Sequence, residues 1–161
     1  ITMGVSGHYG RCSCPDNDTH YANWSLGFDA LLELGPRLGL AGEAFWGENL
    51  RQFGGAIYQA DRLDGLHSHG GWLDLRFKAA QRWRLAAGAG FERVNTGDLD
   101  GSTNARSRNS ALFFNGRYRA ATDVDLGLEV SRHQTNYHNR DAAMAAAPAS
   151  WRLHWTVRAD F

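Results

Sequence analysis

The segment Trp151-Arg152-Leu153-His154-Trp155-Thr156-Val157-Arg158-Ala159-Asp160-Phe161 decides the fold of this chain. Apolar residues occupy every second position of it, and polar or charged residues occupy the positions between them. Successive side chains of a β-strand point to opposite faces, so a period of two predicts a strand with one apolar face. A strand of a soluble sandwich rarely carries two tryptophans and a phenylalanine on a single face. The segment therefore favours a strand whose apolar face meets lipid.

The same alternation recurs upstream, in the segments 2–9, 25–33, 37–46, 73–79, 83–92, 112–119 and 123–130. The connections between these segments alternate in length. Residues 10–22, 47–70, 95–109 and 134–149 form long connections, whereas 34–37, 80–82 and 120–122 form tight turns. Transmembrane barrels have long extracellular loops and short periplasmic turns. The pattern predicts an all-β chain, a transmembrane antiparallel up-and-down β-barrel segment of about eight strands.

The overall composition agrees with this interpretation. No apolar run approaches the ~20 residues of a transmembrane helix. The mean hydropathy of −0.46 is low because lipid-facing and lumen-facing residues cancel in a barrel. Lys+Arg and Asp+Glu number 17 each, which gives no general attraction to nucleic acid or anionic lipid. Ile1 begins directly in a strand-like pattern without a leader, so we expect residues 1–161 to be the C-terminal part of a larger outer-membrane β-barrel domain.

The polar faces of the expected strands carry many charged side chains. Unpaired buried charges are costly, so this much charge does not suit a dry interior. Either the charges pair with each other in a narrow barrel, or they line water in a wide one and select solutes by charge. We expect a channel for small hydrophilic solutes, with arginines favouring anions. The residues expected to line it are Arg76, Arg84, Arg117, Arg119, Arg152 and Arg158, facing Glu43, Asp123, Asp125 and Glu129.

An enzyme at the extracellular rim is a weaker alternative. The residues that it would use are His67, His69, His133, His138, Asp61 and Asp64. His67-Ser68-His69 puts two imidazoles on one side of an extended chain, but no third ligand is identifiable. The segment 97–102, with Asp98, Asp100 and Asn104, resembles a Ca²⁺ loop but lacks the spaced acidic end ligand. We therefore expect solvated loops, no metal, no cofactor and no enzymatic activity.

Three further features are open. Cys12 and Cys14 form a C-x-C that could close a local disulfide in an oxidising compartment or could be two thiols without a role. The long connection 47–70 contains its own alternation at 53–58, which predicts an extra hairpin or a segment folded into the lumen. The stretch 142–149 is alanine-rich, and Pro148 would end a short helix there.

Two stretches of the chain resemble known proteins. The terminal alternation Trp151-x-Leu153-x-Trp155-x-Val157-x-Ala159-x-Phe161 resembles the C-terminal assembly signal of bacterial outer-membrane proteins. The segment 38–50, LGLAGEAFWGENL, followed by 53–59, FGGAIYQ, resembles a stretch of the DcaP-like and related sixteen-stranded porins. Residues 1–10 fit the strand just before it. The resemblance covers the whole chain and about half of such a porin.

The resemblance implies a passive channel in the outer membrane of a Gram-negative bacterium. It also implies a homotrimer, contacts with outer-membrane lipid and lipopolysaccharide, and transport of small solutes without a cofactor. Trp155, Val157 and Phe161 would be read by the barrel-assembly machinery. The alternative is a small closed eight-stranded barrel with a structural, adhesive or loop-mediated binding role, because eight strands leave an interior just wide enough for side chains.

Overall fold

The computed structural model describes residues 1–14, 19–50, 65–100, 104–139 and 149–160 of the chain. These residues form eight β-strands and a 3-10 helix, η3 (Thr96–Leu99). The strands are β1 (Thr2–Cys14), β2 (Thr19–Glu33), β3 (Leu38–Glu48), β4 (His67–Lys78), β5 (Trp83–Val94), β6 (Ala105–Ala121), β7 (Val124–His138) and β8 (Ala149–Ala159). No helix among the described residues has the length and apolar character needed to cross a membrane.

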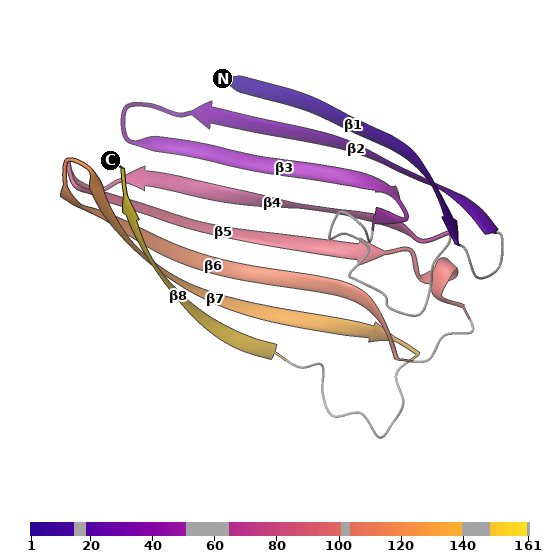
Figure 1. Cartoon of the computed structure of the whole chain (residues 1–161). Helices are drawn as coiled ribbons and strands as arrows, with labels where there is room; N and C mark the ends of the chain where they lie inside the picture. Colours follow the sequence, from indigo (N-terminus) through magenta and orange to yellow (C-terminus); the bar gives the residue numbers. More distant parts are fainter. Residues whose placement is uncertain (15–18, 51–64, 101–103, 140–148, 161) are drawn as a thin grey trace.

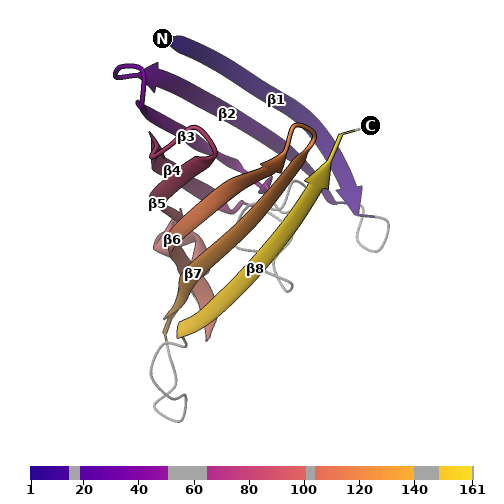
Figure 2. The same ribbon diagram turned by 90° about the vertical axis from the view of Figure 1, so that its left-hand side faces the viewer.

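The eight strands form one antiparallel sheet in the order β1-β2-β3-β4-β5-β6-β7-β8. Each strand therefore pairs only with its neighbours in the chain. The sheet curls into an open trough, with β1 along one edge and β8 along the other (Figures 1 and 2). The predicted up-and-down antiparallel architecture is confirmed. Within the described residues β1 does not pair with β8, so these strands do not form the small closed barrel that was the alternative.

Most of the connections at the two ends of the trough differ in length, as predicted. At one end, which we call the turn end, short turns join β2 to β3, β4 to β5 and β6 to β7. In the first turn the Leu34 N–H donates to the Leu38 carbonyl at 2.9 Å, and Gly35 has a φ of 142°, which favours glycine. At the opposite, loop end the connections β3–β4, β5–β6 and β7–β8 are longer, whereas residues 15–18 alone join β1 to β2. The long connection predicted at 10–22 was therefore wrong, because both strands continue into it. This one-sided arrangement is the one found in transmembrane barrels.

Several strands continue further toward the loop end than the sequence predicted. β1 extends to Cys14 and β7 to His138, where loops were expected to begin at residues 10 and 134. β4 begins at His67 and β6 at Ala105, inside segments that were also expected to be loops. Alternation marks only the part of a strand that has an apolar face, whereas backbone pairing continues beyond it. The predicted boundaries at the loop end were therefore wrong by several residues.

The apolar side chains lie on the convex outer face of the trough rather than in a core. On β8, Trp151, Leu153 and Trp155 are 71%, 65% and 77% exposed. Leu126, Leu128 and Val130 on β7 continue this surface, and they are also exposed. The buried apolar residues of the described chain are only Ala41, Leu50, Leu66, Val94 and Leu99. Water would penalise such an arrangement, and hydrocarbon would stabilise it.

Aromatic residues lie near the ends of the strands on this outer face. Trp83 and Tyr118 face each other across β5 and β6 at the turn end, with ring centroids 4.9 Å apart. Trp46 lies near the loop end of β3 and is also exposed. Such positions match the aromatic girdles of membrane barrels at the two interfaces.

A small packed cluster closes the loop end of β4 and β5. Leu66, Val94 and Leu99 are buried against each other, and Leu99 belongs to η3. Asp98 of the same helix accepts hydrogen bonds from the His67 backbone N–H at 2.8 Å and from its Nδ1 at 3.1 Å. This cluster fixes the start of the β5–β6 connection to the rim of the sheet.

Some expectations fall on residues outside those described. These are the inner hairpin at 53–58, most of the expected helix at 142–149, and the terminal residue Phe161. Cys12 and Cys14 lie in β1, with backbones opposite Tyr21 and Thr19, but their side chains are outside the description. The alternative fates of these thiols therefore remain open predictions.

The two faces of the trough should tolerate charge differently. Leu128→Arg would put a guanidinium on the outer face of β7, whereas Thr156→Arg on neighbouring β8 would put one on the inner face. We expect Leu128→Arg to lower the free energy of unfolding by about 2–4 kcal/mol, and Thr156→Arg to have little effect. Urea titration of the full-length protein folded in lipid vesicles measures both. Equal losses in the two variants would contradict the assignment of the faces.

Candidate functional site

The concave inner face of the trough carries most of the charged side chains of the strands. The pairing register alternates them with the outer apolar residues on every strand from β2 to β8. The charged residues on this inner face are Asp29, Glu33, Glu43, Asp74, Arg76, Lys78, Arg84, Glu92, Arg117, Arg119, Asp125, Glu129, Arg152 and Arg158. A dry core could not hold so many charges, and a wet surface can.

Three cations lie side by side in one row near the turn end. Lys78 pairs with Arg84 across β4 and β5, and Arg84 pairs with Arg117 across β5 and β6. We call Lys78, Arg84 and Arg117 the basic row. Like charges directly opposite each other destabilise a sheet. Their repulsion is weak in water and strong in a low-dielectric medium, so the basic row requires a hydrated environment or bound anions.

Other inner arginines near the turn end have acidic partners. Arg76 binds Asp74 through two hydrogen bonds, Nε to Oδ1 at 2.8 Å and one terminal nitrogen to Oδ2 at 3.2 Å. Arg119 Nε lies 3.1 Å from Asp125 Oδ1. Arg158 pairs with Asp160 at 3.0 Å. Within the described residues the basic row makes no such ion pair, and neither does Arg37 of the turn between β2 and β3, which lines the same hollow. A solute would therefore meet these unpaired charges.

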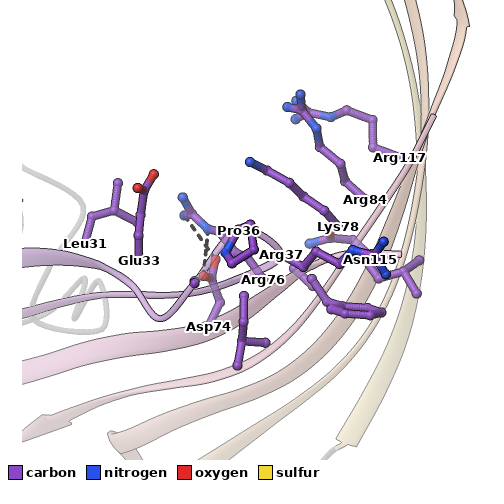
Figure 3. Close-up of a pocket in the computed structure, with 16 residues that line it drawn as sticks. Leu31, Glu33, Pro36, Arg37, Asp74, Arg76, Lys78, Arg84, Asn115 and Arg117 are labelled. Atoms are coloured by element: carbon purple, nitrogen blue, oxygen red, sulfur yellow. Dashed lines mark hydrogen bonds and ion pairs between the residues drawn. The ribbon is translucent and has the colours of Figure 1, made fainter. Parts of the chain in front are cut away.

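The basic row borders a hollow of about 500 Å³ on the inner face. Arg84 and Lys78 extend into it from one side, and Glu33 of β2 stands on the other (Figure 3). The bidentate Arg76–Asp74 pair lies between them, marked by dashed lines in Figure 3. Cations therefore lie on one side of the hollow and the carboxylate of Glu33 on the other. Between them, the Arg76–Asp74 ion pair has no net charge.

Acidic residues gather on the neighbouring strands. Asp29 of β2 lies opposite Glu43 of β3, and Glu33 lies further along β2 on the same face. Glu43 accepts a hydrogen bond from the Trp72 indole Nε1 at 3.3 Å. The inner face thus changes from acidic on β2 and β3 to mainly basic on β4 to β6. A polar solute beside this wall would experience a transverse electric field.

Two phenylalanine rings on the inner face, Phe45 and Phe113, reach over glycines of the neighbouring strand. A Cβ at Gly88 would collide with the ring of Phe113, and a Cβ at Gly70 would come within 2.8 Å of the Phe45 ring. Both rings therefore cover backbone where a larger residue would stand. This packing keeps bulky groups against the wall and leaves the space above it free.

The remaining predicted lining residues are spread along β7 and β8. Arg152 lies opposite Ser131, and Glu129 lies opposite Asn115 on one side and His154 on the other. Asp123 lies in the turn between β6 and β7, where its carbonyl accepts from the Asp160 N–H at 3.0 Å. The structure thus brings Arg84 and Arg117 together and leaves Arg152 and Glu43 well apart from them in the register. Their role as lining residues stays a prediction.

The residues considered for a rim enzyme or a metal do not gather. His67 contacts Asp98 and lies 3.7 Å from Glu48, while His138 lies 3.8 Å from Asp100. His133 faces inward on β7 beside Ser131, and His69 faces outward on β4. The described part of the chain contains no group of three or more His, Cys, Asp or Glu side chains that could hold a metal ion. Asp61 and Asp64 lie outside the described residues.

Four charged residues of the hollow were not chosen from the sequence as lining residues: Glu33, Arg37, Asp74 and Lys78. Alternation correctly put Lys78, Glu33 and Asp74 on inward faces, but it did not show which strands' charges share a row. The missing signal was the register between strands. In a tight hairpin such as β4–β5 that register follows from the turn, so the Lys78–Arg84 contact could have been found in this way.

Comparisons with known proteins agree with this architecture. The chain is similar to the solved structure of the outer membrane channel DcaP of Acinetobacter baumannii, with a TM-score of 0.83 and 10% sequence identity. The likeness covers 99% of this chain and 46% of that channel, so the chain spans less than half of its length. No protein-family model matches the chain, and no curated protein matches it. The likeness establishes the fold, which is that of a porin-like β-barrel wall.

The packing of Phe113 on Gly88 gives a direct test of the inner face. In Gly88→Ala the new Cβ would meet this ring, the Leu73 carbonyl oxygen at 2.5 Å and Asp74 Cβ at 2.9 Å. We expect a loss of about 1–3 kcal/mol in the free energy of unfolding, measured by urea titration in vesicles. Phe113→Ala in the same chain should restore only part of it, because the carbonyl contact remains.

Gly116→Ala is the matched control. Its Cβ would meet only Leu85 Cδ2, at 3.4 Å, which is an ordinary contact. The packing argument fails when Gly88→Ala and Gly116→Ala are equally stable.

Proposed function

We propose that this chain forms part of the wall of a water-filled outer-membrane channel for passive diffusion of small hydrophilic solutes, with a preference for anions. The observation that carries the proposal is the basic row, Lys78, Arg84 and Arg117, which has no ion-pair partner among the described residues. Three adjacent cations are costly in a packed interior and useful on the wall of an aqueous path.

The two surfaces of the trough support the same proposal. The outer face exposes aliphatic and aromatic side chains, which suit hydrocarbon, and the inner face exposes charges, which suit water. The fold likeness to an outer membrane channel adds support for this location. Rings of cationic side chains favour anions, while the acids Glu33 and Glu43 nearby would orient solutes that carry both charges.

A membrane channel of this kind must be closed. The unpaired edges of β1 and β8 would expose N–H and C=O groups to lipid, which costs several kcal/mol for each group. We therefore infer that further strands complete the barrel in the membrane. A barrel wider than eight strands also leaves room for water, because the diameter grows with the number of strands.

Assembly and oligomeric state belong to the same proposal. Trp155 and Val157 lie on the outer face of β8 and are 77% and 55% exposed, which suits recognition by the barrel-assembly machinery together with Phe161. A homotrimer in the outer membrane of a Gram-negative bacterium is the assembly that we infer for the complete channel.

The anion preference can be tested by neutralising the basic row. The full-length protein with Lys78→Gln, Arg84→Gln and Arg117→Gln would be reconstituted in planar bilayers under a salt gradient. We expect the ratio of anion to cation permeability, derived from the reversal potential, to fall at least about threefold, because the local field weakens. The control is Arg82→Gln, which removes an exposed cation in the turn between β4 and β5.

Two results would count against the proposal. An unchanged reversal potential in the triple variant would refute the assignment of anion preference to the basic row, but it would not refute the channel itself. The absence of any conductance from the folded full-length protein would refute the proposed channel function.

A further inference from the structure

The outer face of β3 to β7 contains a groove of about 600 Å³ toward the loop end. Small outward-facing residues on neighbouring strands form its floor: Ala44, Gly71, Ala89 and Ser110. Larger outward side chains stand beside them: Leu73, Phe91 and Leu112. The groove is therefore a mainly apolar depression in the surface that we assign to lipid contact.

Cationic side chains border the groove on its loop side. Arg93 of β5 lies directly opposite Arg108 of β6, and both face outward. Arg108, Arg132 and Gln134 also line the groove itself. None of these three arginines makes an ion pair within the described residues, and no outward-facing position that the structure describes on β4 to β8 carries an acid. The one outward-facing acid among the described strand residues, Glu48 of β3, accepts a hydrogen bond from the Trp24 Nε1 at 3.1 Å and lies 3.7 Å from His67. No described acid therefore pairs with these arginines.

Arg108 is held over the groove by an aromatic contact. Its guanidinium carbon lies 5.7 Å from the centroid of the Phe91 ring, within the range of a cation–π interaction. The imidazole of His69 meets the same ring edge-on, with centroids 6.2 Å apart. Phe91 therefore holds the guanidinium of Arg108 at the groove.

Arg93 opposite Arg108 is a like-charge pair, and such pairs destabilise a sheet unless an anion lies between them. Phosphate oxygens accept two parallel hydrogen bonds from a guanidinium, which makes arginine well suited to that anion. The adjacent apolar groove suits a hydrocarbon chain. A single molecule that satisfies both surfaces has a phosphate and an acyl chain.

We propose that this groove binds a phosphorylated lipid of the lipid A type, with an acyl chain along Gly71 and Ala89 and a phosphate at Arg93 and Arg108. The proposal rests on the outer-membrane location given in the proposed function. Charge favours lipid over a second copy of the chain. The described outward faces of the strands offer a single acid, Glu48 of β3, which already lies against Trp24 and His67, whereas lipid A carries phosphates.

The first test uses native mass spectrometry of the full-length protein in detergent, titrated with diphosphorylated lipid A. We expect the double variant Arg93→Gln, Arg108→Gln to raise the dissociation constant at least tenfold. Dephosphorylated lipid A should bind the native protein as weakly as lipid A binds the double variant. The control Arg82→Gln removes an exposed cation in a turn at the opposite end and should bind lipid A as the native protein does.

The second test fills the groove without changing any charge. Ala89→Leu would occupy the groove floor, whereas Ala87→Leu adds the same side chain at the next outward position of β5, which does not line the groove. Ala89→Leu should reduce lipid A retention severalfold, and Ala87→Leu should not. Both substitutions add apolar surface to a face that is already exposed and apolar, so both variants should fold.

Several results would overturn the inference. The first is that the double arginine variant binds lipid A as tightly as the native protein does. The second is that the native protein binds dephosphorylated lipid A as tightly as lipid A. The third is that Ala89→Leu and Ala87→Leu change lipid A retention equally. A changed oligomer mass in the arginine variant, without loss of lipid, would instead identify this face as a contact between copies.

Bilayer conductance separates this inference from the proposed function. A protein that conducts normally but binds no lipid A refutes only the groove, and one that binds lipid A but does not conduct refutes only the channel.

Discussion

The main-chain hydrogen bonds between neighbouring strands are the constraint on which the rest of the structure depends. An unpaired N–H or C=O in hydrocarbon costs several kcal/mol, so strands can cross a membrane only when their ladders are continuous. Continuity also fixes the register, and the register decides which face each side chain occupies. A slip of one residue in β7 would turn Leu126 and Leu128 toward the inner face and Glu129 toward lipid. The apolar band, the charged lining and the outer groove all follow from the same pairing.

Much of the fold could be predicted from the sequence because period-two alternation is strong where one face meets lipid. The outward residues of β8 and the parity of turns and loops were both readable in this way. The strand ends at the loop end were not, because residues such as those of β7 beyond His133 are polar on both faces. Backbone hydrogen bonds hold these residues in the sheet, and such bonds cannot be predicted from the hydropathy pattern of the side chains. The small cluster around Leu99 was equally hidden, since it depends on a contact between η3 and Leu66, which the β4–β5 hairpin separates in the chain.

The candidate site was predictable in composition and not in arrangement. Alternation put Arg84 and Arg117 on the inward face, but only the register makes them neighbours of Lys78 and gives Arg76 its partner Asp74. The difference matters chemically. An arginine paired with a carboxylate contributes little net field, whereas an unpaired row contributes a large one. The register also changes the interpretation of the outward-facing Arg93 and Arg108. A lone arginine near a strand end indicates only a residue at the membrane interface, whereas two arginines opposite each other indicate a site that binds an anion.

The strictly sequential order of the strands has a consequence for how such proteins change over time. Every pairing in the sheet joins neighbours in the chain, so a hairpin can be duplicated or lost with re-pairing needed at only one seam. Circumference then varies in steps of two strands, and with it the width of the space enclosed. Side chains along each strand can diverge as long as their polarity keeps its alternation. An ancestry of repeated hairpins would thus allow closely similar backbones to persist after almost all sequence identity has gone.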